Sequence, residues 1–277
     1  MVAGNCQASF LYRALTRSAE LTDRYELVYF RNFRKGDQDS IKRRHVAGCA
    51  VLLEQVAHNT GKIFFRDALP ADCATLRFPI LWMNSLWPTQ VRDRRIGPSA
   101  PFDTGLYPYG DQVMLDLLQQ GLEPAAAARR WLETDLGKVV DLDRFHEINV
   151  EKHRQLDDRS ELKLGAEALA GFRRSRLFLS NDHPTRGLLR RLRDLAFEAL
   201  GVAAPADETA ELIGGMEDVE IPVHPSVAAH FRLAWHAATP SWRWRDRRYT
   251  TEEFMRRYAQ MDFGVSAAAA RPLQPAL

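Results

Sequence analysis

The stretch MVAGNCQASFLYRAL, residues Met1 to Leu15, decides the fold that we expect for this chain. A strand-like start runs through Gly4 and Asn5 into a cysteine, and the residues that follow have helical spacing. The apolar side chains that would share one face of this helix are Phe10, Leu11, Ala14 and Leu15. A strand followed at once by an amphipathic helix predicts the first part of a parallel α/β sheet.

Apolar and β-branched runs recur along the chain, with helical patterns between them. The expected strands are the stub Met1–Ala3, YELVYF (Tyr25–Phe30), CAVLL (Cys49–Leu53), TLRFPIL (Thr75–Leu81) and RLFLS (Arg176–Ser180). A buried first strand usually has about five or six residues. Either the first strand starts upstream of Met1, or it is simply short. The alternation of strands and helices predicts a parallel sheet with crossover helices.

The middle of the chain, about residues 111–172, has helical spacing and is expected to be a helical insertion in a single domain over residues 1–265. A separate helical domain is the alternative. The run TRGLLRRLRDLAFEALG predicts a helix that begins after Thr185 and ends at Gly201. Residues 266–277 are rich in Ala and Pro and are expected to form a flexible tail.

Composition limits the classes of function. The 277 residues include 38 Lys and Arg and 36 Asp and Glu, a net charge of +2 that is too small for dedicated nucleic-acid binding. The three cysteines are widely spaced, which argues against a disulfide framework or a zinc knuckle and favours a reducing compartment. The chain also lacks a long apolar run and a signal-peptide pattern, so we expect a cytoplasmic protein.

Two strand-to-helix junctions carry side chains suited to chemistry. The first, GNCQ, offers the thiol of Cys6, and the second, SNDHPT (residues 180–185), offers the imidazole of His183. Ligands of an open parallel sheet bind outside the carboxyl ends of the strands, where loops lead into helices. If the two junctions meet there, a nucleophile and a general base would lie together.

Cys6 would lie in the first turn of its helix, where the helix dipole lowers the pKa of a thiol. Gly4 would let a ligand approach, and the N–H groups of Cys6 and Gln7, with the side chain of Asn5, would face a developing oxyanion. The other reading is structural: a cysteine at a strand end is more often an inert core residue, and a His before Pro-Thr can simply begin a helix.

Further polar and aromatic residues are weaker candidates. Gln55, Asn84 and Asn181 follow expected strands and could bind an acyl oxygen or an amide, although such residues also cap helices. Arg43 and Arg44 belong to a basic run that could attract phosphates, although most charge runs are solvated. Trp242 and Trp244 alternate with arginines and could stack on a sugar or an adenine, although packing against the body is the more common outcome.

Metal and nucleotide motifs are not recognised. HEINVEKH separates His146 and His153 by seven positions, whereas a zinc-protease helix needs a separation of four. There is no Walker A loop and no GxGxxG, so we expect neither a metal nor dinucleotide chemistry.

Several motifs, in order, resemble those of the WcbI-type polysaccharide-biosynthesis family of acetyltransferases. They are GNCQA, LLEQV, RFPILWMNSLWP, PYGD, RLFLSNDHPT and IPVHPSV, and the likeness runs from about Met1 to Trp235. The resemblance implies a Rossmann-like or SGNH-like three-layer α/β fold that binds coenzyme A. By position, Cys6 matches the family's cysteine, His183 its histidine, and His224 lies in a motif that could bind substrate. Asp182 stands where an asparagine is expected, and either orients the imidazole or caps the helix.

The activity implied by this resemblance is transfer of acetyl from acetyl-CoA to a hydroxyl of a capsular or cell-surface polysaccharide, or of its sugar precursor. Cys6 would carry the acetyl group or hold the thioester, with His183 as general base. A cysteine-dependent esterase or thioesterase would use the same residues with water as acceptor. A non-catalytic module that binds coenzyme A or a glycan is the third possibility.

Overall fold

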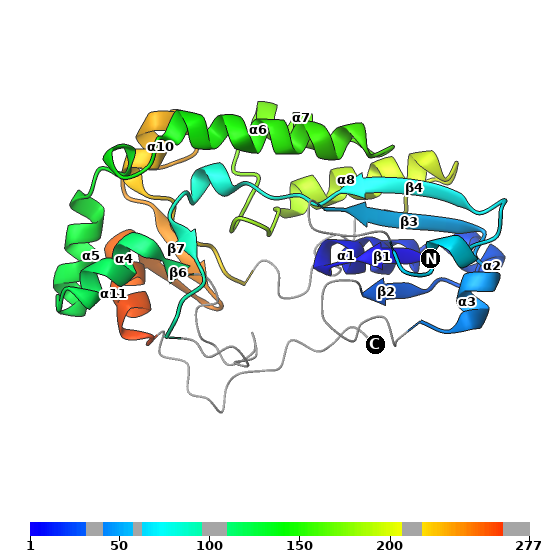
Figure 1. The fold of residues 1–277 in the computed structure, drawn as a ribbon, viewed down its shortest axis with the longest axis horizontal. Coiled ribbons are helices and arrows are strands. Elements are labelled where there is room, and N and C mark those ends of the chain that lie inside the picture. The colour runs from blue at the N-terminus through cyan, green and yellow to red at the C-terminus, as the bar shows by residue number, and fades with distance from the viewer. Residues whose placement is uncertain (32–40, 58–62, 96–109, 207–217, 263–277) are drawn as a thin grey trace. The chain divides into compact units, whose positions relative to one another are not determined.

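The computed structural model describes residues 1–31, 41–57, 63–95, 110–206 and 218–262 (Figure 1). The chain divides into two compact units. The first consists of Met1–Trp82, Val150–Phe172 and Asp182–Gly214, and the second of Met83–Asn149, Arg173–Asn181 and Gly215–Leu277. The single-domain organisation stays a prediction, and the expected tail 266–277 lies outside the described residues.

The first unit contains a four-stranded parallel sheet in the order β2-β1-β3-β4. Its strands are β1 (Val2–Gly4), β2 (Tyr29–Arg31), β3 (Val51–Val56) and β4 (Ala74–Pro79). Val2 lies opposite Tyr29 on one side and Leu53 on the other, and Leu53 lies opposite Leu76. The expected parallel α/β architecture is therefore confirmed, with a short first strand.

Helices flank this sheet in a three-layer arrangement. On one face, Ala3, Phe30 and Leu52 form a buried cluster with Val46 of α3 (Arg43–Ala47) and with Ile63 and Phe65. The other face is covered by α1 (Cys6–Leu15), which packs against both β1 and α8 (Arg186–Ala199). The remaining helices of this unit are α2 (Ala19–Arg24), η2 (Arg66–Ala68) and α7 (Gly165–Gly171). This is a Rossmann-like fold.

One expected strand is absent: Arg176–Ser180 is not a strand, although Phe178 and Leu179 are buried as an apolar run predicts. The backbone of this region bonds to two different segments instead of one. Met83 donates its N–H to Asn181 O at 2.6 Å, and Ile221 donates to Leu179 O at 2.7 Å. Without a single partner strand no ladder forms.

The helical spacing expected between residues 111 and 172 is confirmed by α4 (Gln112–Gln119), α5 (Pro124–Glu133), α6 (Leu142–Asp158) and α7. Apolar side chains of α6 are not all buried, because Ile148 is 39% exposed. Asn149 and His153 are buried in its place, between Leu142 and Leu156. Polar residues on the buried side of α6 conceal its apolar periodicity in the sequence.

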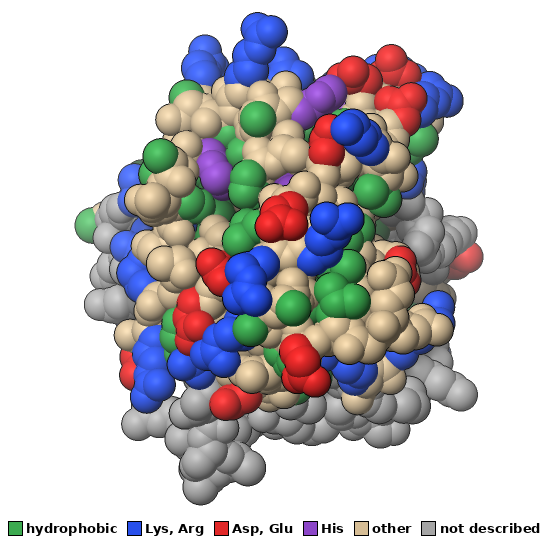
Figure 2. All heavy atoms as spheres, turned by 90° about the vertical axis from the view of Figure 1, so that its left-hand side faces the viewer, with side chains coloured by type: hydrophobic (Ala, Val, Ile, Leu, Met, Phe, Trp, Pro, Cys, Tyr) green, Lys and Arg blue, Asp and Glu red, His purple; other side chains and the backbone are tan. Residues whose placement is uncertain are grey.

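The second unit adds short antiparallel pairs to its helices. β5 (Gln90–Val91) pairs with β6 (Gly110–Asp111), and β7 (Ser241–Trp244) pairs with β8 (Arg247–Thr250). α11 (Thr251–Gln260) packs against α5 and α4. The other elements here are η3 (Asn84–Leu86), η5 (Leu136–Lys138) and α10 (Pro225–Phe231). Figure 2 shows a face on which basic and acidic side chains are intermixed.

Among the described residues, no helix combines the length and the apolar composition that a bilayer crossing needs.

Candidate functional site

The turn between β1 and α1 places Cys6 at the first position of the helix. The N-cap of α1 is Asn5, whose side-chain oxygen accepts the N–H of Gln7 at 2.9 Å. Gly4 is required before it, since a Cβ at this position would lie 2.6 Å from Cβ of Gln55 and 2.7 Å from Cβ of Ala8. Glycine at this position therefore lets the turn pack closely against Gln55 of β3 and Ala8 of α1.

Two side chains hold the backbone of this turn. The hydroxyl of Tyr29 donates to the carbonyl oxygens of Gly4 and Asn5, at 3.1 and 3.0 Å. The side-chain oxygen of Gln55 accepts the N–H of Asn5 at 2.9 Å. Because these groups satisfy the polar atoms of the turn, the position of Cys6 is fixed from β2 and β3 at once.

Gln7 joins the two predicted junctions. Its side chain is fully buried, and its amide nitrogen donates to Leu81 O at 2.7 Å and to Asp182 O at 2.9 Å. Its oxygen accepts the N–H of Leu81 at 2.9 Å and the amide of Gln55 at 3.1 Å. The Asp182 loop therefore lies against the start of α1 within the first unit, so the two junctions meet.

This network gives both Gln7 and Gln55 a positioning role. Both side chains form hydrogen bonds with one another and with the backbone, and both are buried. These bonds hold the β1–α1 turn and the Asp182 loop, and a role of either side chain in substrate binding stays a prediction. The N–H of Gln7 likewise donates to Asn5, so its assignment to an oxyanion is not supported.

The pKa of Cys6 is the main electrostatic correction. Burial, and after it the negative charge of Asp182, raise it, whereas the N–H groups of Gln7 and Cys6 and the charge of Arg13 lower it, and the net pKa is about 12. The expected lowering by the helix N-terminus is present but is outweighed by loss of hydration. At neutral pH this largely buried thiol is protonated.

Arg13 is a site residue that we did not predict. It follows Cys6 by seven positions, which is about two helical turns, so the two side chains share one face of α1. Its charge acts on Cys6, and burial lowers the pKa of its guanidinium. Nε of Arg13 is buried without a hydrogen-bond partner among the described residues. The seven-residue spacing from Cys6 was the signal in the sequence that could have identified Arg13.

His183 is partly buried in the loop that leads into α8. The N-cap of α8 is Thr185, not Asp182, so a capping role for Asp182 is not observed. Asp182 instead presents its charge to Cys6 and its carbonyl oxygen to Gln7. The first unit thus brings a thiol, a carboxylate and the loop that carries an imidazole to the carboxyl edge of the sheet.

Asn84 and Asn181 belong to the second unit. There the side-chain amide of Asn181 donates to the side-chain oxygen of Asn84 at 3.4 Å. Their assignment to ligand binding stays a prediction.

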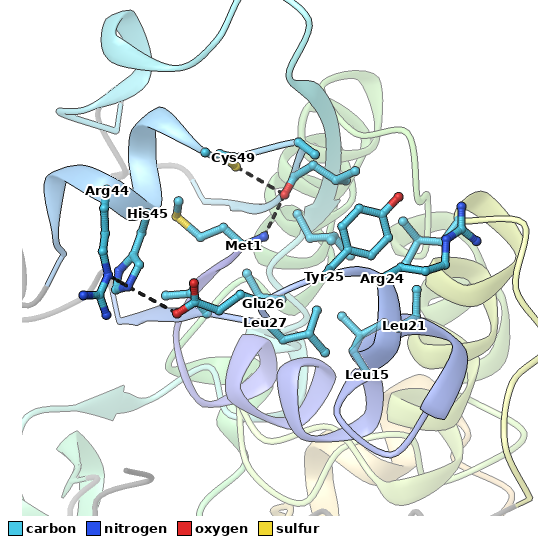
Figure 3. Close-up of a pocket in the computed structure, with 17 residues that line it drawn as sticks. Met1, Leu15, Leu21, Arg24, Tyr25, Glu26, Leu27, Arg44, His45 and Cys49 are labelled. Carbon is cyan, nitrogen blue, oxygen red and sulfur yellow. Dashed lines mark hydrogen bonds and ion pairs between the residues drawn. The ribbon is translucent and has the colours of Figure 1, made fainter.

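Arg43 and Arg44 lie at the wrong edge of the sheet for the role expected of them. They begin α3, which leads into the amino end of β3, whereas Cys6 follows the carboxyl end of β1. Arg44 lines a cavity with Met1 and Val51 at that amino edge (Figure 3). A basic run after a strand gave no information on which edge its residues reach.

The three residues expected to bind substrate are buried in the second unit. Trp242 and Trp244 are 1% and 2% exposed, so neither ring can stack on a ligand. His224 is buried, and its Nδ1 accepts the N–H of Ser226 at 3.1 Å while Nε2 donates to Trp131 O at 2.8 Å. Both nitrogens of His224 are used to begin α10 and to tie it to α5.

The fold and this turn define a class: a Rossmann-like α/β protein with a cysteine at the junction between its first strand and first helix. A family model described as "Polysaccharide biosynthesis enzyme WcbI" matches residues 1–205. The chain belongs to the WcbI polysaccharide biosynthesis enzyme family, and it is accordingly an enzyme of that class.

A solved structure is similar to the whole chain. It is described as native WcbI, a novel polysaccharide biosynthesis enzyme, without a disulfide bond between coenzyme A and a cysteine of that protein. The TM-score is 0.65 at 17% identity, covering 97% of this chain and 91% of the other. No curated protein matches the sequence.

Proposed function

We propose that this protein is an O-acetyltransferase that moves acetyl from acetyl-CoA to a hydroxyl of a capsular or cell-surface polysaccharide, or of its sugar precursor. The observation that carries the proposal is the bond from Gln7 to Asp182 O, which sets the loop of His183 against the turn of Cys6. A base and a sulfur at one edge of a parallel sheet suit acyl transfer, since ligands of such sheets bind at that edge.

His183 is the general base in this proposal. It takes the proton of the acceptor hydroxyl as the oxygen attacks the acetyl carbon. The bond between that carbon and the sulfur of the donor then breaks, and the released CoA thiolate takes up a proton. The partly exposed position of His183 suits a group that meets a substrate.

Cys6 acts here as a neutral thiol beside the donor. A pKa of about 12 leaves almost no thiolate at neutral pH. Direct transfer to the sugar is therefore favoured over an acetyl-cysteine, which would need a base to ionise this thiol first.

Coenzyme A fits the residues of this edge as a substrate. The partly exposed thiol of Cys6 would meet its sulfur, and the positive charge of Arg13 acts on the same position. The related structure is described as being without a disulfide bond between coenzyme A and a cysteine of that protein. We assign the same neighbourhood in this chain to Cys6.

The test is incubation of the protein with acetyl-CoA, with and without candidate sugars, while free CoA is measured. Release that requires a sugar supports transfer, and release without a sugar supports the thioesterase alternative. Binding of CoA without turnover supports a binding module and contradicts the proposal.

His183→Ala should lower turnover by about 10²- to 10⁴-fold, the contribution of one positioned base. His230→Ala is the matched control, because His230 lies on α10 and pairs with Asp143 at 2.9 Å. Circular dichroism should show both variants folded. Equal turnover in the two variants would remove His183 from the mechanism.

A further inference from the structure

Two cysteines that are far apart in the sequence lie in contact at the amino edge of the sheet. Cys49 precedes β3 and Cys73 precedes β4, and these strands pair in parallel with Val51 opposite Ala74. Ala74 donates its N–H to Ala50 O at 3.0 Å, which extends the pairing outward toward both cysteines. Their sulfur atoms are 3.6 Å apart.

The surroundings of the two thiols differ. Cys49 is 5% exposed and belongs to the buried cluster with Phe30 and Phe65, and its thiol donates to Val51 O at 3.4 Å (Figure 3). Cys73 is only partly buried against the same cluster. Solvent therefore reaches Cys73 first, and Cys49 is held directly behind it.

The two sulfur atoms are in van der Waals contact. A disulfide bond needs the sulfur atoms to approach to about 2.05 Å, roughly 1.5 Å nearer than now, which rotation about the two side-chain bonds can supply. Side chains at the ends of paired strands are already held together by the ladder, so little chain entropy opposes the bond.

We propose that Cys49 and Cys73 are a redox modification site, at which a low-molecular-weight disulfide such as oxidised glutathione produces an intramolecular disulfide. Cys73, as thiolate, attacks one sulfur of oxidised glutathione and releases one glutathione. Cys49 loses its proton to solvent and attacks the Cys73 sulfur of the mixed disulfide, which releases the second glutathione. Two thiols are oxidised, and one glutathione disulfide is reduced to two thiols.

This site is independent of the proposed acetyl transfer. Cys49 lines the cavity of about 370 Å³ at the amino edge, with Leu15 and Leu53 among its other lining residues. Cys6 follows the opposite, carboxyl end of β1. The burial that raises the pKa of Cys73 to about 11, helped by Cys49, should make the reaction slow at pH 7 and faster at pH 9.

The experiment treats the Cys6→Ser protein with oxidised glutathione at pH 7 and pH 9, blocks free thiols with N-ethylmaleimide, and maps tryptic peptides without reduction. Arg66 lies between the two cysteines, so trypsin separates them. We expect one cross-linked Cys49–Cys73 peptide pair, faster formation at pH 9, and a Tm about 5 °C higher than that of the reduced protein.

Cys49→Ser is the matched control and should stop at the glutathione adduct of Cys73. The proposal is overturned if the protein with both cysteines also stops at that adduct while Cys49 still reacts with N-ethylmaleimide. It is equally overturned if both thiols remain unmodified at pH 9.

Discussion

Cys6 lies within reach of one negative and one positive charge, and their balance controls its ionisation. Asp182 raises the pKa of the thiol and Arg13 lowers it, while burial is the largest cause of its value of about 12. Two neighbouring charges that act in opposite directions allow a matched pair of experiments on a single sulfur.

Asp182→Asn should speed alkylation of Cys6 by iodoacetamide, because removal of the negative charge lowers the pKa and increases the thiolate fraction. Arg13→Gln should slow it, because a positive charge is lost. Rates are followed for the Cys6 peptide by mass spectrometry between pH 7 and pH 9. In the unaltered protein the rate should rise about tenfold per pH unit without a plateau, as for any acid titrating well above this range.

A plateau near pH 8 would show that the thiol of Cys6 ionises at its ordinary pKa, and so would contradict the effect of burial. Equal rates in the two variants would show that neither charge acts on the sulfur.

At the scale of elements, the β1–α1 turn depends on glycine at one position. Gly4→Ala should lower the free energy of unfolding by about 2 kcal/mol or more, because the new methyl group meets Gln55 and Ala8 at less than 3 Å. Urea unfolding followed by circular dichroism measures the loss.

Gly187→Ala is the control for that substitution. Gly187 lies in α8, and a Cβ there meets no atom within 4 Å. Alanine in a helix should therefore stabilise by about 1 kcal/mol. If both alanines have the same effect, the close packing around Gly4 is wrong.

The sequence predicted elements whose signal is local. The spacing of Phe10, Leu11 and Ala14 identified α1, and all three are fully buried. An apolar run alone does not distinguish a strand from a buried irregular segment, so the assignment of Arg176–Ser180 as a strand was wrong. The hydrogen bonds of Gln7 join residues 74 and 175 positions away, and such pairings have no signature in a single sequence.

The edge of the sheet that a residue reaches was predicted where a strand led directly into it. Cys6 directly follows β1, and its edge was predicted for that reason. The Asp182 loop follows no strand, and the hydrogen bond from Gln7 holds it at the same edge. Arg43 and Arg44 follow a loop and begin a helix, so their edge depended on the direction of the next strand. Trp242 and Trp244 alternate with arginines, yet the face they share is the buried one, because aromatic rings have more apolar surface to remove from water.

At the scale of the whole molecule, the family-like motifs separate into two groups. GNCQ and the Asp182 loop build the candidate site in the first unit. The described part of PYGD and the motif IPVHPSV build the second unit: Gly110 lies so close to Asp93 that a Cβ would be 2.9 Å from its backbone nitrogen, and His224 caps α10. Motifs of one family therefore need not all mark a reaction centre.

A substitution at Asp111 tests whether a family-like motif has a structural role, because Asp111 forms hydrogen bonds with three segments of the second unit. Its carboxylate accepts Thr89 Oγ1 at 2.6 Å, the N–H of Met114 at 2.9 Å and Trp131 Nε1 at 3.0 Å. Asp111→Ala would leave these donors without their acceptor, and should lower the free energy of unfolding by about 3 kcal/mol.

Asp116→Ala on the same helix is the matched control, since Asp116 is exposed and accepts only an exposed bond from Gln112 among those resolved here. Its effect should stay within about 0.5 kcal/mol. Urea unfolding of both variants makes the comparison, alongside His183→Ala, which should unfold like the unaltered protein. If Asp111→Ala unfolded like Asp116→Ala, the second unit would not depend on this carboxylate, and a role for the motif in binding or catalysis would become the better explanation of its presence.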